Sequence, residues 1–364
     1  MIIFLLAVAT YQAAHGPTLP AASSMSPEQL SSPSSSSDAQ ACEASKVPLL
    51  VISMDHKRLD GFVPAATKAR PKSAQSICRI PGVVGNALPC APGVVPEALV
   101  QNATWSTVCR RSNNNEPSVT PQLTMGAVGL ILAHAHAWIR MLDAGLPCAI
   151  IAEDDVQVYA DSFVAFLERA CEAVRTRQLQ LVQLQSDGPR RKTGAPGDGA
   201  DQSGRWVKPS PQESALSAAA LLARRDAGPT NLLINTTAYN MGMYLLSREG
   251  ARKALAHSFP LNFQLDLPEG TLRSCLDSGM FAPPVAQALE LGSDTQFRPG
   301  SGQVKSAKTG PVEDCSGVVG DVDLLARLES AHLAAARAVG STERRCEFDY
   351  RQWKDDKDGH TLPE

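Results

Sequence analysis

Three consecutive carboxylates, Glu153, Asp154 and Asp155, are the residues of this sequence best suited to do chemistry. They follow residues 148–152, an apolar run with the length of a buried strand. In an open α/β sheet, ligands bind outside the carboxyl ends of the strands. Three acids at such a place repel one another unless a cation joins them. The triplet therefore suggests a metal site, although an acidic triplet on a loop is more commonly a solvated surface.

Side-chain alternation assigns different roles to the three acids. Along a strand, Glu153 and Asp155 are expected to share one side, and Asp154 to point away. Two carboxylates on one side can hold Mn²⁺ or Mg²⁺, hard ions that accept diphosphate oxygens as further ligands. A metal bound in this way stabilises the charge that develops on a departing nucleoside diphosphate. Glu153 and Asp155 are the predicted metal ligands.

The segment before the acids predicts a helix over residues 124–144. Thr124 can cap its start and Gly145 its end. Gly126 and Gly129 weaken the first turns, which indicates close packing there. Apolar residues recur on one face at helical spacing: Val128, Ile131, Leu132, Ala135, Ile139 and Leu142.

Further strands and helices alternate along the chain. Together they predict an α/β fold with a mostly parallel central sheet. Residues 83–120 are rich in Pro, Gly and Asn and are predicted to form a loop. Predicted strands cover residues 47–54, 77–80, 179–185 and 237–246, and predicted helices cover residues 62–70, 161–177, 247–257 and 321–339.

Composition divides the chain into segments. Residues 1–16 resemble a secretory signal peptide without its positive start, and a short disordered apolar start is the alternative. Residues 17–46 are Ser- and Pro-rich and predict a disordered stalk. Residues 47–297 form the predicted catalytic domain, and residues 298–364 a linker, a helix and a tail. Within the domain, residues 186–228 predict a mobile insertion, either a lid or a surface loop without function.

Charge and hydropathy exclude some classes of partner. The net charge of −3 and the lack of a basic stripe argue against nucleic acid as the main partner. No run of about 18 apolar residues is present, so no transmembrane helix is predicted. The sequons at Asn102 and Asn235 agree with the secretory pathway, either the lumen of the ER or Golgi or export. Nine cysteines leave at least one thiol without a partner in the chain.

The order of these motifs resembles glycosyltransferase family 25, which includes bacterial lipooligosaccharide galactosyltransferases and collagen hydroxylysine galactosyltransferases. Its most specific part is the helix with Gly126, Gly129 and His134, then the apolar strand, then Glu-Asp-Asp-Val. Shorter stretches agree in order over about residues 47–296: VPLLVISMDHKR, ICRIPGVVG, AYNMGMYLLSREGARKAL, LDLPEG, and PPVAQ followed by GSDTQ.

The resemblance implies a GT-A-type, Rossmann-like nucleotide-sugar fold with a UDP-sugar donor and Mn²⁺ or Mg²⁺ at the acid motif. It implies transfer of a hexose, most often galactose, to a hydroxyl of a glycan or glycoprotein acceptor. Glu153 and Asp155 match the metal-binding acids, with Asp155 the first choice for metal and diphosphate contact. Asp154 belongs to the same motif and is assigned to the donor.

Further site residues follow from the resemblance. Asp55 and Arg58 match the charged residues after the opening strand, where a solvated turn is the alternative to a nucleotide site. His134 matches the histidine of the helix motif, although a helical histidine is more often structural. Asp266 and Asp294 match later acids, one of which can deprotonate the acceptor hydroxyl. A cap or loop carboxylate is the alternative for both.

Departures from the family pattern keep a second function open. The helix has Ala127, Leu130 and Ala133 where the family has Glu, Cys and Ser, and Val84 stands where the family has Asp before Gly85. These losses favour a non-catalytic descendant that binds glycan or nucleotide sugar, whereas retention of all three acids favours an enzyme. A metal-dependent phosphohydrolase or nucleotidyltransferase is a third reading, but further acids at the expected spacing are not evident.

Overall fold

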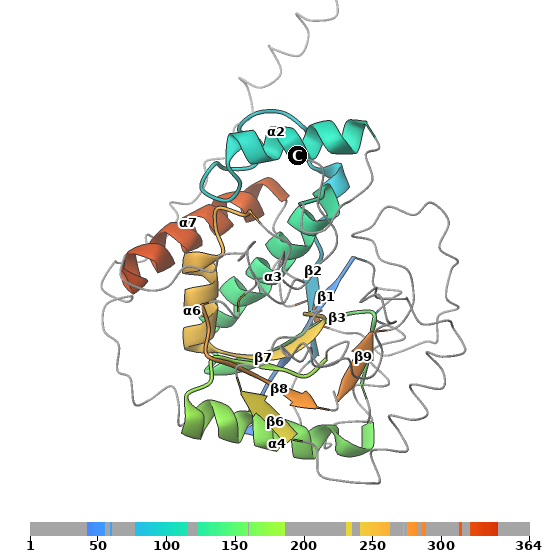
Figure 1. The fold of residues 1–364 in the computed structure, drawn as a ribbon, viewed down its shortest axis with the longest axis vertical. Coiled ribbons are helices and arrows are strands. Elements are labelled where there is room, and N and C mark those ends of the chain that lie inside the picture. Colours follow the sequence, from blue (N-terminus) through green and yellow to red (C-terminus); the bar gives the residue numbers. More distant parts are fainter. Residues whose placement is uncertain are drawn as a thin grey trace, which may run out of the picture. The chain divides into compact units, whose positions relative to one another are not determined.

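A computed structural model describes residues 42–54, 59, 77–114, 123–158, 160–185, 231–234, 241–262, 272, 275–282, 285–288, 313–314 and 321–340. These residues all belong to one compact unit, residues 35–364. Figure 1 shows a sheet with helices on both faces. The predicted signal peptide (residues 1–16), insertion (residues 186–228) and helix (residues 62–70) lie outside the described residues and stay predictions.

The central sheet has eight strands in the order β10-β2-β1-β3-β7-β5-β8-β6. Six of them run in one direction, whereas β7 and β6 run in the other. The chain is therefore α/β with a mostly parallel sheet, as predicted, and is compatible with a Rossmann-like fold. The strands are β1 (Leu49–Ser53), β2 (Ile77–Pro81), β3 (Cys148–Glu153), β5 (Leu181–Gln183), β6 (Asn231–Ile234), β7 (Met243–Ser247), β8 (Ser278–Ala282) and β10 (Glu313–Asp314).

Helices cover both faces of this sheet, so its central strands are apolar along both sides. In β1, Leu50 and Ile52 pack into one core, while Leu49 and Val51 pack into the other. The first core contains residues of α2 (Asn102–Asn113), α3 (Met125–Asp143), α6 (Arg248–His257) and α7 (Asp321–Val339). The second core contains α4 (Ala160–Arg177), which lies across the sheet from α3 in Figure 1.

Helix α3 begins and ends as the sequence predicts. The Thr124 hydroxyl accepts a hydrogen bond from the Ala127 N–H at 3.0 Å. At the other end, Gly145 has φ +65°, and the N–H of Leu146 donates to the Met141 carbonyl at 3.0 Å, as in a Schellman cap. Among the described residues, α3 alone has the length and hydropathy to cross a membrane, but 78% of that segment is buried as a core helix.

Close packing at Gly129 joins α3 to the short 3₁₀ helix η4 (Gly85–Ala87) after β2. A Cβ on Gly129 would collide with the Val83 carbonyl oxygen and lie 2.6 Å from the Gly85 nitrogen. A Cβ on Gly85 would collide with the Met125 carbonyl oxygen. The expected close approach is therefore confirmed at Gly129, where two backbones touch without side chains between them.

The prediction of a loop over residues 83–120 is wrong at α2. Trp105, Val108 and Cys109 are buried at helical spacing, and a Cys90–Cys109 disulfide ties this helix to the preceding loop. The apolar stripe of α2 has only three residues, and the residues around it include Asn, Ser and Arg. The composition of this segment therefore did not indicate a helix, because the stability of α2 depends on tertiary packing.

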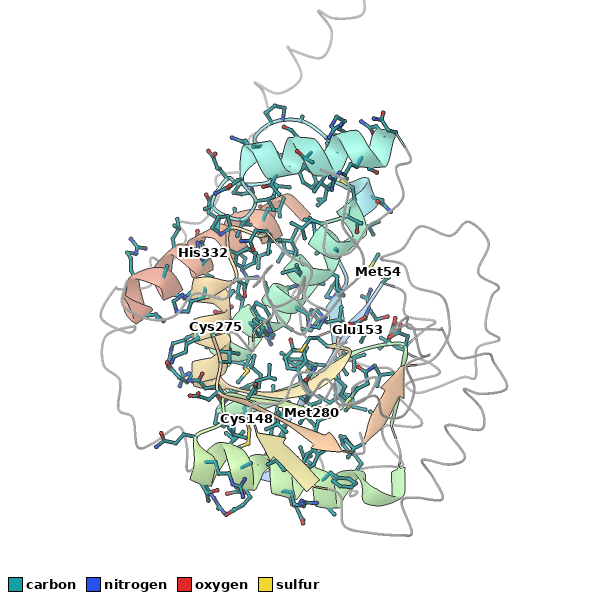
Figure 2. All side chains as sticks on the ribbon, viewed as in Figure 1. Met54, Cys148, Glu153, Cys275, Met280 and His332 are labelled. Carbon is teal, nitrogen blue, oxygen red and sulfur yellow. A yellow bond between two sulfur atoms is a disulfide. The ribbon has the colours of Figure 1, made fainter. Side chains whose placement is uncertain are left out.

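Described residues on both sides of the predicted domain, residues 47–297, also belong to the fold. Cys42 is buried and forms a disulfide with Cys148, although the prediction placed residue 42 in the stalk. The C-terminal helix α7 packs on α3 and α6 and shares their core, so residue 297 does not end the domain. His332 of α7 (labelled in Figure 2) donates from Nδ1 to the Leu255 carbonyl at 2.8 Å. Burial lowers the pKa of His332, against smaller upward effects of this hydrogen bond and Glu329.

We expect Gly129→Ala to lower the free energy of unfolding by about 1–3 kcal/mol, since the added methyl group meets backbone that cannot rotate away. Urea denaturation measures this loss. Arg140→Ala on the same helix, at a partly exposed position, should change stability by less than about 1 kcal/mol. A Gly129→Ala protein as stable as wild type would contradict the backbone contact.

Candidate active site

The three acids lie where β3 leaves the sheet, at the edge where the parallel strands β1 and β2 also end. The N–H of Glu153 donates to the Gly242 carbonyl at 2.7 Å, and the N–H of Asp154 donates to the Ile52 carbonyl at 3.1 Å. Asp154 and Asp155 then form a turn into β4 (Val156–Val158). Strand alternation stops at Glu153, so a shared side for Glu153 and Asp155 stays a prediction.

The acids differ in exposure. The side chain of Glu153 is 21% exposed and Asp155 is partly exposed, whereas Asp154 is buried. Asp154 accepts a hydrogen bond from the Ser53 hydroxyl at 2.6 Å, which joins the ends of β1 and β3. The two predicted metal ligands are thus the two acids with surface to offer.

Arg79 brings a positive charge to the same edge. Its Nη2 donates to the Ser53 carbonyl at 3.2 Å, next to the hydroxyl that binds Asp154. Sequence reasoning treated Arg79 only as a strand residue. A charged residue between apolar neighbours near the end of a half-buried strand was the available signal.

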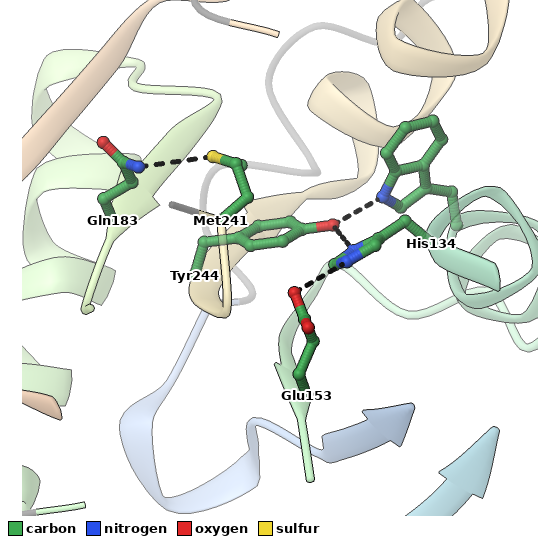
Figure 3. Close-up of polar contacts among 6 residues, drawn as sticks. His134, Glu153, Gln183, Met241 and Tyr244 are labelled. Atoms are coloured by element: carbon green, nitrogen blue, oxygen red, sulfur yellow. Dashed lines mark hydrogen bonds and ion pairs between the residues drawn. The ribbon is translucent and has the colours of Figure 1, made fainter. Parts of the chain in front are cut away.

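Glu153 is also the outer member of a polar network that runs into the core (Figure 3). Its Oε1 lies 3.5 Å from Nε2 of His134. Nδ1 of His134 lies 2.8 Å from the Tyr244 hydroxyl, which accepts a hydrogen bond from Nε1 of Trp138 at 2.9 Å. The His134, Tyr244 and Trp138 side chains have no exposed surface, so their polar atoms depend on one another.

Helix and strand geometry explain why these residues meet. His134 and Trp138 are four residues apart on α3 and therefore point from the same face of the helix. Tyr244 lies on β7 opposite Ile151 of β3, two residues before Glu153 and on the same face of the sheet. The rings of His134 and Tyr244 stack with centroids 5.6 Å apart.

The hydrogen-bond pattern assigns the proton of each group. Burial, with a smaller contribution from the charge of Glu153, raises the pKa of Tyr244 against the lowering effect of its hydrogen bond from Trp138, so the hydroxyl keeps its proton. Trp138 can only donate to the Tyr244 hydroxyl, and the Tyr244 O–H can in turn donate to Nδ1 of His134. In the tautomer that accepts this hydrogen bond, the ring proton of His134 is on Nε2, which lies 3.5 Å from Oε1 of Glu153.

His134 is fully buried, which bears on the catalytic role predicted for it. A ring without exposed surface has no atom available to a ligand, and the partly exposed group that it faces is Glu153. Sequence reasoning placed His134 beside Trp138 but missed Tyr244. A tyrosine in a buried strand was the available signal, because its hydroxyl needs a partner.

The partly exposed carboxylates fit a hard divalent cation. Mn²⁺ and Mg²⁺ take oxygen ligands, and Mg²⁺ is commonly held by one or two carboxylates with waters and phosphates completing the shell. Glu153 and Asp155 supply that donor set at the end of the sheet where ligands bind. Among the described residues, however, the acids do not form a group of three converging ligands.

The group of three that does converge is made of sulfur. The Sγ atoms of Cys42, Cys148 and Cys171 lie within 4.8 Å of one another, and that of Cys171 is 3.1 Å from that of Cys42. Cys42 and Cys148 form a disulfide, and burial is the main cause that raises the pKa of the free Cys171 thiol to about 12. Burial therefore disfavours a thiolate here. Cys148 of this group begins β3, the strand that Glu153 ends (Figure 2).

The remaining predicted site residues lie outside the described residues: Asp55, Arg58, Asp266 and Asp294. Two of them follow described residues in the chain. Met54 follows β1 at the same sheet edge as the acids. The end of β9 (Ala286–Ala288) pairs with Val156, the residue after Asp155, and Asp294 is six residues further along the chain.

Two of the three departures from the family helix, Ala127 and Ala133, fall at buried positions, whereas Leu130 is partly exposed. Ala127 is 5% exposed and Ala133 is 1% exposed. A larger polar side chain at either position would point into the core and not into the solvent around Glu153. Gly85 packs against α3 as described above, so the missing acid at Val84 leaves that contact in place.

Comparison with known proteins adds no assignment: no protein-family model matches the chain, and no curated protein matches its sequence.

The sulfur group yields a test of the local geometry. In Cys148→Ser, we expect Cys42 to form a disulfide with Cys171, because their sulfur atoms already lie 3.1 Å apart. Peptide mass mapping of the alkylated, unreduced protein detects this pairing. In the control Cys109→Ser, the Cys42–Cys148 disulfide should persist. An alkylated Cys42 in Cys148→Ser would contradict the arrangement.

Proposed function

We propose that the chain is a metal-dependent glycosyltransferase with a GT-A-type fold, which moves a hexose from a UDP-sugar to a hydroxyl of a glycan or glycoprotein. Galactose is the favoured sugar because of the resemblance to glycosyltransferase family 25. The observation that carries the proposal is the pair of partly exposed carboxylates, Glu153 and Asp155, at the carboxyl end of a central strand in a mostly parallel sheet.

The residues divide the proposed reaction between them. Glu153 and Asp155 hold Mn²⁺ or Mg²⁺, which when bound offsets the negative charge of the departing UDP. Asp154 acts through Ser53, with which it fixes the ends of β1 and β3 around the donor site. Arg79 places a positive charge at the same edge, where it complements a diphosphate.

Binding and proton transfer complete the proposal. Asp55 and Arg58, after the opening strand, contact the nucleotide. Asp266 or Asp294 accepts the proton of the acceptor hydroxyl as its oxygen attacks the sugar. These four assignments rest on the sequence motifs.

A location in the secretory pathway is part of the proposal. Disulfides at Cys42–Cys148 and Cys90–Cys109, with Cys78 and Cys275 also disulfide-bonded, are compatible with an oxidising compartment. Asn102 of the first sequon is exposed at the start of α2, as a glycan acceptor must be.

Release of UDP from a panel of UDP-sugars, with Mn²⁺ and with chelator, tests the function. We expect turnover of one donor that requires the metal and falls by about 100-fold in Asp155→Asn. The control Asp143→Asn changes an exposed aspartate that pairs with Arg327, and should keep turnover.

Two other outcomes separate the alternatives. Metal-dependent binding of a UDP-sugar without turnover would establish the non-catalytic descendant instead. A chain that neither binds nor turns over any UDP-sugar would overturn the proposed role of the acids.

A further inference from the structure

We propose that Tyr244, through His134, is a positioning residue for Glu153, and that Trp138, Tyr244 and His134 together hold this carboxylate in the orientation that binds the metal. The inference rests on the proposed function, because it concerns the same cation site. It assigns a role to three buried side chains that touch neither substrate nor metal.

The chain of contacts runs from the core to the surface. Trp138 donates to the Tyr244 hydroxyl, which also lies 2.8 Å from Nδ1 of His134. Nε2, on the other side of the His134 ring, faces Oε1 of Glu153 at 3.5 Å. A network that only satisfied core atoms would close on itself in the interior. This one continues to a side chain that is 21% exposed.

The charge of the network suits a cation site. His134 carries a positive charge only if both ring nitrogens are protonated, so the ring can face Glu153 at 3.5 Å without having to cancel its negative charge. A lysine or arginine at this place would orient the carboxylate but also neutralise it, and would compete with the metal.

Rigidity is the expected benefit. A glutamate side chain has three rotatable bonds, and ordering it costs free energy when a metal binds. A donor fixed on α3, braced by the stacked ring of Tyr244 on β7, restricts Glu153 before binding. Groups that hydrogen-bond metal ligands typically change metal affinity by about 10- to 100-fold when they are removed.

Three substitutions separate positioning from packing. Tyr244→Phe keeps the buried ring but removes the hydroxyl that fixes the His134 proton. His134→Leu removes the ring nitrogen that faces Glu153. His134→Gln keeps an N–H near the place of Nε2 and is the conservative rescue. His332→Leu is the matched control, since it removes a different buried histidine with a hydrogen bond of 2.8 Å.

The measurement is the affinity of the full chain for Mn²⁺ in the presence of UDP, followed by the electron paramagnetic resonance signal of free Mn²⁺. We expect Tyr244→Phe and His134→Leu to bind Mn²⁺ about 10- to 100-fold more weakly than wild type. His134→Gln should recover most of the affinity, and His332→Leu should keep it. Thermal melting without metal shows that each variant is folded.

The contrary results are distinct. Folded Tyr244→Phe and His134→Leu proteins with wild-type affinity would overturn the positioning role and leave the proposed function intact. An equal loss in His332→Leu would also overturn it, because the effect would then come from general destabilisation. A wild-type chain that binds no Mn²⁺ would overturn the metal-dependent function, and the inference with it.

Discussion

Burial of β3 on both faces governs how polar groups are arranged around the candidate site. Its residues up to Ala152 have almost no exposed surface, because α3 covers one face and α4 the other. Carboxylates are costly in such surroundings, so they occur only where the strand leaves the sheet. Even there, Asp154 remains buried and needs the Ser53 hydroxyl. Asp154 is thus buried, whereas Glu153 is partly exposed and can offer oxygens to a ligand.

The same constraint explains the network behind Glu153. A tyrosine, a histidine and a tryptophan inside one core lose contact with water, and each unsatisfied polar atom would cost about 1–3 kcal/mol. Helical spacing brings His134 and Trp138 to the single hydroxyl of Tyr244, which provides a partner for Nδ1 of His134 and for Nε1 of Trp138. The other ring nitrogen of His134 faces Glu153, so the buried network is connected to a partly exposed side chain.

Sequence patterns predicted the strongly periodic parts of this chain. The long apolar stripe and caps of α3 and the apolar runs of β1 and β3 predicted these elements, and the acids lie at the end of β3 as expected. Helix α2 was not predicted because its apolar stripe is short and polar residues surround it. The role of Tyr244 was not predicted because β7 lies about 90 residues from β3 along the chain. Local periodicity does not show which distant strands pair. Strand alternation at Asp155 gave way to a turn, which the run of acids did not signal.

The central claim is that Glu153 and Asp155 bind a divalent cation where β3 ends. Crystals of the full chain grown with Mn²⁺ and UDP test it most directly, because manganese scatters anomalously and can be located without assumptions about its ligands. The account predicts a peak at bonding distance from the carboxylate oxygens of Glu153 and Asp155, with UDP diphosphate oxygens on its other side. A peak at other side chains, or UDP bound at this edge without manganese, would contradict it.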